Sequence, residues 1–237
     1  MKKILKNELI LSVTVVLGLT VALLHQRMMN TAVDAKGLLL RWHPLEITLT
    51  ALTLTVLALL VPGVRKQEIP DGFETHFPAS LPGAFGSAAA GAGILVTVLA
   101  GSALSGSYLD TAWQLFGLSA PVCFLLTSLA RALGKKPFFL LHVVICLFFV
   151  LHIVIRYQLW SGNPQLPDYL FQVFACISLT LTAYYRTAFD LGMGRRRLYL
   201  FSNLMAVYLC FLSLVGSGDG RFYFGGGVWA LANLCVL

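Results

Sequence analysis

The chain has 237 residues, a mean hydropathy of +0.81 and a formal net charge of +7, and only 11% of its residues are charged. About a quarter of the residues in a soluble domain are charged, so this composition excludes a soluble globular protein and indicates an all-α, polytopic integral membrane protein. Membrane topology accounts for the positive charge, so we expect the lipid bilayer as a partner and no nucleic acid.

Apolar stretches predict about eight transmembrane helices, because a bilayer core about 30 Å thick needs roughly 20 apolar residues per helix. The last stretch is short and ends without a polar anchor, so the number is seven if it does not span. The connections are too short to bury a core, and we therefore expect a single transmembrane domain over residues 1–237. The stretches lie near 9–24, 44–64, 81–105, 110–131, 137–156, 168–188, 198–215 and 222–237.

The N-terminus is expected to be cytoplasmic. Lys2, Lys3 and Lys6 precede the first apolar stretch, as in a secretory signal, but no small-x-small cleavage site follows, so the stretch is predicted to be an uncleaved helix. Lysine and arginine are enriched in cytoplasmic loops. With the N-terminus inside, twelve of the 17 basic residues are cytoplasmic and five are not. The short loops and the Met-Lys-Lys start favour a bacterial inner membrane.

The third apolar stretch is rich in small residues at four-residue spacing. Gly83, Ser87 and Gly91 form one such series, and Ala89 and Gly93 form another. In lipid, faces of this kind let helix backbones approach closely. The third stretch is therefore predicted to be a central helix packed within the chain, or alternatively a helix that binds a second copy or a partner subunit.

The fourth and fifth stretches resemble the sixth and seventh. At an offset of 58 residues, Asp110 aligns with Asp168, and the alignment continues through the following six positions. This likeness predicts a tandem hairpin repeat over 108–156 and 166–215, with both copies running in the same direction.

Glycine and proline predict details of these helices. Gly63, Gly134 and Gly192 each precede basic residues at the end of an apolar stretch, where glycine commonly caps a helix. Pro121 lies in the middle of the fourth stretch and is expected to break or kink it, because proline lacks a backbone N–H. Discontinuous helices often mark substrate sites in transporters.

Four polar residues suggest a ligand site at the outer ends of the fourth and sixth stretches. Asp110 and Asp168 begin these stretches, and Gln114 and Gln172 follow one helical turn deeper on the same face. If the two helices are neighbours, these side chains line an outward-facing vestibule for a small polar or cationic ligand. The alternative is that both acids are helix N-caps.

Two histidines lie within the fifth stretch, where ionisable residues are functional candidates. His142 and His152 are about 15 Å apart along a helix and roughly 80° apart around it, so they cannot share one metal ion. We predict no metal and no cofactor. An outer haem would pair His152 with His25 or His43.

The function predicted from these features is a small-molecule permease or the membrane component of a transport system. The chain has no nucleotide-binding motif, so ATP-driven transport would need an ATPase partner subunit. Non-enzymatic function is favoured. The alternatives are an intramembrane enzyme or a redox or haem protein that uses His142 and His152, and a structural membrane subunit that binds a partner.

Overall fold

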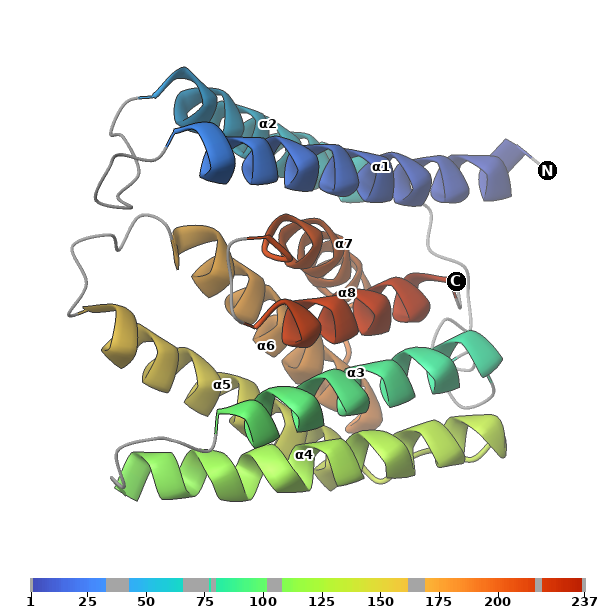
Figure 1. Cartoon of the computed structure of the whole chain (residues 1–237). Helices are drawn as coiled ribbons and strands as arrows, with labels where there is room; N and C mark the ends of the chain where they lie inside the picture. Colours follow the sequence, from blue (N-terminus) through green and yellow to red (C-terminus); the bar gives the residue numbers. More distant parts are fainter. Residues whose placement is uncertain are drawn as a thin grey trace.

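The computed structural model describes residues 2–32, 43–65, 77, 80–101, 108–161, 169–215 and 219–235, with the backbone alone for 2–9 and 159–161. Within these ranges the chain is all-helical and forms eight α-helices (Figure 1). They are α1 (Lys2–Thr31), α2 (Pro44–Arg65), α3 (Leu81–Ala100), α4 (Tyr108–Ala132), α5 (Phe139–Ser161), α6 (Leu170–Asp190), α7 (Arg196–Leu212) and α8 (Gly220–Leu234).

Five of the eight helices in the described ranges, α1 to α5, are long and apolar enough to cross a membrane, which indicates a membrane protein. The other three differ in length or polarity. α6 carries Gln172, Arg186 and Asp190, and α7 and α8 have 17 and 15 residues. At about 1.5 Å per residue, α8 is about 22 Å long, shorter than a bilayer core of about 30 Å. Eight membrane crossings therefore stay a prediction.

The helices α3 to α8 form a closed ring. Each packs against the next one along the chain, and α8 packs against α3. Helix α8 also contacts α6 and lies toward the middle of the ring (Figure 1). Helices α1 and α2 pair with each other and pack on α7. Successive helices run in opposite directions. We call the end where α4, α6 and α8 finish the Arg131 end, and the opposite end the Asp219 end.

The central helices are α7 and α8 rather than α3. In α7, 12 of 17 residues are buried, and in α8 10 of 15, against nine of 20 in α3. Three consecutive glycines let α8 approach three helices. A Cβ at Gly225 would lie 2.8 Å from a carbonyl oxygen of α3, one at Gly226 2.8 Å from a leucine methyl of α6, and one at Gly227 3.2 Å from a cysteine of α7.

The small residues of α3 pack within the chain. Gly86 and Gly93 face α8, where a Cβ at Gly93 would lie 2.5 Å from the carbonyl oxygen of Arg221. Gly91 faces α4, where a Cβ would lie 3.3 Å from the carbonyl oxygen of Pro121. Close approach of backbones is what small-residue faces provide in lipid. The intramolecular interpretation of the third stretch agrees with these contacts.

The first helix is longer than its apolar stretch. Residues 25–43 were expected to be a connection, but α1 continues to Thr31. His25 Nδ1 donates a hydrogen bond to the carbonyl oxygen of Leu212, at the end of α7, over 3.0 Å, and Met28 is buried. The helix therefore continues where hydropathy ends because it packs against protein rather than lipid.

Two of the three glycine caps are confirmed and the third is wrong. Gly134 after α4 and Gly192 after α6 have φ of 68° and 76°, the left-handed conformation that favours glycine. Gly63 lies inside α2, which ends at Arg65. Pro121 does not break α4, which runs through it without interruption, and the kink expected as the alternative stays a prediction. A helix packed against neighbouring helices can tolerate the loss of the one backbone hydrogen bond that proline removes.

Candidate functional site

Three of the four residues of the predicted outer vestibule lie in the described part of the chain. Asp110 lies buried in the first turn of α4, with Gln114 one turn further, and Gln172 is buried in α6. Asp168 lies outside the described residues. The vestibule required α4 and α6 to be neighbours, but α4 packs on α3 and α5, and α6 packs on α5, α7 and α8. Helix α5 therefore separates the two glutamines.

His152 is enclosed by aromatic rings near the Asp219 end. The indole N–H of Trp113 donates to His152 Nδ1 over 3.2 Å. The Phe222 ring stacks on the imidazole with centroids 4.3 Å apart, and Phe148 packs 5.8 Å away. Indole nitrogen only donates, so the proton of a neutral His152 is on Nε2. The other ring nitrogen, Nε2, is buried and has no hydrogen-bond partner among the described residues.

An ion pair lies beside this histidine. Arg156, one turn from His152 on α5, pairs with Asp219, which immediately precedes α8. Burial raises the pKa of the Asp219 carboxyl above its ordinary value, and the Arg156 guanidinium acts in the opposite direction. The pair joins the ends of α5 and α8 and closes the ring at the Asp219 end.

His142 pairs with a carboxylate at the Arg131 end. Its Nδ1 lies 2.8 Å from Oδ2 of Asp190, the last residue of α6. The other carboxylate oxygen lies 3.7 Å from Nη2 of Arg186, one turn earlier on the same helix. His142 and Arg186 are 0% and 1% exposed. The Asp190 carboxylate therefore pairs with both a histidine and an arginine inside the bundle.

A second buried arginine lies close to the first. Arg131 of α4 is 1% exposed, donates from Nη1 to Oδ1 of Asn233 over 3.0 Å, and lies near enough to Arg186 for the two charges to repel each other. Five helices, α4 to α8, contribute to this group. We call it the arginine cluster, and it consists of Arg131, His142, Arg186, Asp190, Tyr199, Asn203 and Asn233.

The arginine cluster has more donors than acceptors. Nε and Nη2 of Arg131, Nε and Nη1 of Arg186, and Nδ2 of Asn233 are buried without a hydrogen-bond partner among the residues that the structure describes. Oδ1 of Asn203 and Oδ2 of Asp190 are acceptors in the same position. Even with His142 neutral, two guanidinium charges face one carboxylate in the part of the chain that the structure describes. Buried charges are normally paired and hydrogen-bonded, so this excess of positive charge needs a physical account.

Aromatic and small residues shape the cluster. The Phe77 ring covers Arg186, with the guanidinium carbon 4.0 Å from the ring centroid, a cation–π contact. Phe77 also packs edge-on against Phe189 and Tyr199. On the other side, a Cβ at Gly83 would clash with the Arg131 guanidinium. Glycine in α3 therefore makes room for that arginine.

Polar side chains follow the buried face of α6 from one end of the bundle to the other. At 100° per residue they lie within an arc of about 160°, and the first and last are about 27 Å apart along the axis. Thr182 is buried, and its Oγ1 has no hydrogen-bond partner among the described residues. We call this set the polar face of α6, and it consists of Gln172, Cys176, Ser178, Thr182, Arg186 and Asp190.

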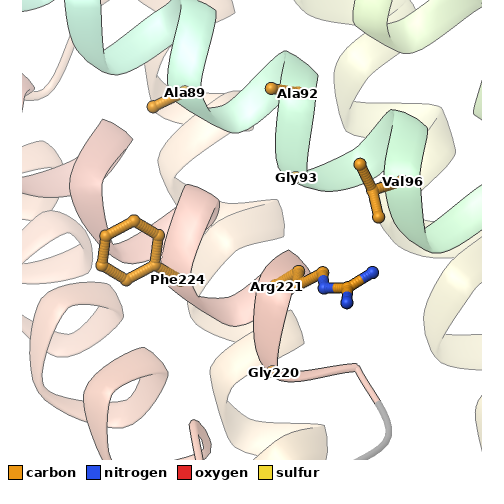
Figure 2. Close-up of a pocket in the computed structure, with 7 residues that line it drawn as sticks. All are labelled: Ala89, Ala92, Gly93, Val96, Gly220, Arg221 and Phe224. Carbon is orange, nitrogen blue, oxygen red and sulfur yellow. The ribbon is translucent and has the colours of Figure 1, made fainter.

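A groove of ≈ 500 Å³ lies between α3 and α8, away from the arginine cluster (Figure 2). It contains none of the predicted site residues. Its walls are apolar apart from Arg221, whose side chain extends beside Val96, and Phe224 lines its other end. The lining residues are Ala89, Ala92, Gly93, Val96, Gly220, Arg221 and Phe224.

In the described part of the chain, no three histidine, cysteine, aspartate or glutamate side chains are grouped so that they could hold a metal ion. His25, one of the two expected haem partners of His152, bonds to the carbonyl oxygen of Leu212.

No protein-family model, curated protein or solved structure matches this chain. Its class follows from the fold alone: a helical protein whose described residues include five helices able to cross a membrane.

The sequence indicated His142 of the arginine cluster but missed its other members, although a signal was present. Arg131 and Arg186 were counted only as basic residues at the cytoplasmic side. Both precede the capping glycines, Gly134 and Gly192, and therefore lie inside the helices rather than in the loops. Asp190 lies one turn after Arg186. The signal was therefore the position of each arginine inside its helix, before the capping glycine.

Proposed function

We propose that this chain is a small-molecule permease of a bacterial inner membrane, with its N-terminus in the cytoplasm and a solute pathway inside the ring of helices α3 to α8. The observation that carries the proposal is the polar face of α6. Polar and ionisable groups inside a membrane protein are costly and commonly mark solute or ion pathways. Here they extend over about 27 Å, close to the thickness of a bilayer core.

The arrangement of the other helices supports the same function. Exposed residues of α6, such as Leu181 and Tyr184, lie on the side of the helix away from Arg186. The polar face is therefore turned toward α5, α7 and α8. A helix that only anchored the protein in lipid would not need buried threonine, arginine and aspartate.

The pathway is closed in this conformation. Aromatic rings of α4, α5 and α8 pack together between His152 and the arginine cluster, with Phe124 5.3 Å and Phe149 6.1 Å from the Trp229 ring. The Arg156–Asp219 ion pair closes the Asp219 end. A permease alternates between closed and open arrangements, and these contacts would separate in the open one.

Thiol labelling tests the proposal without knowledge of the solute. In a chain whose native cysteines are replaced by alanine, Thr182→Cys places a thiol on the polar face of α6, and Leu181→Cys places one on the lipid-facing side. We expect a membrane-impermeant, anionic methanethiosulfonate reagent to modify Thr182→Cys in vesicles, because water enters the pathway when it opens. Leu181→Cys should not react, because a thiol in lipid does not ionise.

If both variants stay unmodified from either side of the membrane, the polar face of α6 is a sealed core and the permease proposal is wrong. Reaction at Leu181→Cys alone would also contradict it, because water would then reach the opposite face.

A partner-binding subunit is less well supported. The small residues of α3 on which that alternative depended, Gly86, Gly91 and Gly93, are already in contact with α4 and α8.

A further inference from the structure

We infer that the arginine cluster is the binding site for an oxyanion, the chemical class of solute that the proposed permease would carry. This inference rests on the proposed function for its biological setting, but the site is argued from its own charges and donors. The same chemistry is present in free phosphate and in the phosphate of a lipid headgroup, and the experiment below distinguishes the two.

The first step is the balance of charge. Asp190 offers one negative charge, and it is engaged by His142 at 2.8 Å and by Arg186 at 3.7 Å. Arg131 donates its hydrogen bond to the neutral amide oxygen of Asn233 rather than to a carboxylate. Leaving a guanidinium buried beside a second one is strongly unfavourable unless a counter-charge is present. An anion between the two arginines supplies that charge.

The second step is the balance of hydrogen bonds. Arginine can only donate, so the Asn233 atom facing Arg131 is the amide oxygen, and its Nδ2 is a further donor. Together with Nε and Nη2 of Arg131 and Nε and Nη1 of Arg186, five buried N–H-bearing atoms make no hydrogen bond among the described residues, and the Tyr199 hydroxyl beside both arginines offers them a single oxygen. An oxyanion presents several acceptor oxygens at once. Guanidinium groups bind such oxygens in pairs, with geometry as well as charge.

The third step excludes the opposite charge. A cation here would meet two guanidinium groups and one carboxylate already in use, and like charges repel strongly where water is scarce. The small cationic ligand expected from Asp110 and Asp168 therefore has no counterpart in the arginine cluster. A purely structural network would instead satisfy its donors internally, as buried polar groups do in the great majority of proteins.

Binding of inorganic phosphate to the full chain in a neutral detergent tests the inference. Isothermal titration calorimetry gives the affinity, and thermal unfolding with and without phosphate gives the stabilisation. We expect wild-type protein to bind, and Arg131→Gln to bind at least about tenfold more weakly, since a hydrogen bond to a charged group contributes about 1.5–3 kcal/mol. Arg197→Gln, which removes an exposed arginine outside the cluster, should bind as wild type does.

Asn233→Asp provides a variant whose folding is not at risk. The new carboxylate lies where Oδ1 of Asn233 accepts from Arg131, so it neutralises the guanidinium from within the chain. We expect its unliganded melting temperature to equal or exceed that of wild type and its phosphate binding to be lost. Unchanged phosphate affinity in Asn233→Asp would overturn the inference, because the anion would then bind elsewhere.

A second arm separates the two sources of phosphate. The protein is reconstituted in nanodiscs of phosphatidylcholine alone or with phosphatidylglycerol, and retained lipid is measured by native mass spectrometry. The wild-type protein could retain phosphatidylglycerol selectively, lose it in Asn233→Asp, and not bind free phosphate. That result assigns the site to a lipid headgroup and contradicts the permease proposal. If the protein binds neither phosphate nor phosphatidylglycerol, the inference of an oxyanion site is wrong. If phosphate binds but the thiol of Thr182→Cys is not modified in the labelling experiment, the oxyanion site stands and only the permease proposal is rejected.

Discussion

At Asp190 one carboxylate contacts two side chains through its two oxygens. Oδ2 lies 2.8 Å from His142 Nδ1, and Oδ1 lies 3.7 Å from Arg186 Nη2. The Asp190 side chain is 3% exposed and that of Arg186 1%. By contrast, the side chains of Arg156 and Asp219 are 21% and 13% exposed. Two ion pairs of different burial therefore occur in the same molecule.

Replacing Asp190 by asparagine should destabilise the fold strongly. The change leaves Arg131 and Arg186 buried without a carboxylate, and removal of one partner from a buried pair typically costs about 3–5 kcal/mol. Asp219→Asn is the matched control, and its effect should be smaller because water screens the more exposed pair. The measurement is denaturant unfolding of both variants in the same detergent. A smaller loss in Asp190→Asn than in Asp219→Asn would show that the cluster holds no net buried charge.

Among the helices, the tightest packing joins α3 to α8. A Cβ at Gly93 would lie 2.5 Å from a backbone oxygen of α8, and one at Gly225 2.8 Å from a backbone oxygen of α3. Backbone atoms cannot rotate away as side-chain ends do, so the helices themselves would have to move apart. The contact fixes the position of α8, which carries Asn233 to Arg131.

Gly93→Ala should lower the free energy of unfolding by about 1–3 kcal/mol, the usual penalty for overpacking. Gly63→Ala is the control, because a Cβ at Gly63 meets nothing within 4 Å. In that helix alanine is favoured over glycine by about 1 kcal/mol, so the control should be neutral or slightly stabilising. Denaturant unfolding of the two variants measures the difference. Equal stabilities would mean that α3 and α8 do not approach each other this closely.

Helix positions were largely predictable, and helix environments were not. Apolar stretches located all eight helices of the described ranges, and Gly134 and Gly192 located two of their ends, because these caps have a positive φ that favours glycine. Hydropathy did not predict the extension of α1 to Thr31, which follows from packing on α7. The tandem repeat stays a prediction, although α4 and α6 end in the same glycine cap.

The whole molecule brings together residues that are far apart in the sequence. Arg131 and Asn233, 102 residues apart, meet because α8 closes the ring between α7 and α3. Which helices become neighbours depends on close packing, and an apolar sequence in which most faces look alike does not specify it. For that reason the sequence indicated His142 but not the arginines beside it, and Gln114 was grouped with Gln172 although α5 lies between their helices.

Uptake of radiolabelled inorganic phosphate into proteoliposomes tests the central claim most directly: that the arginine cluster is the solute site of a permease. The account predicts saturable uptake by wild-type protein above that of empty liposomes, no uptake by Asn233→Asp, and normal uptake by Arg197→Gln. Wild-type uptake equal to that of empty liposomes, or equal uptake by wild type and Asn233→Asp, would contradict it.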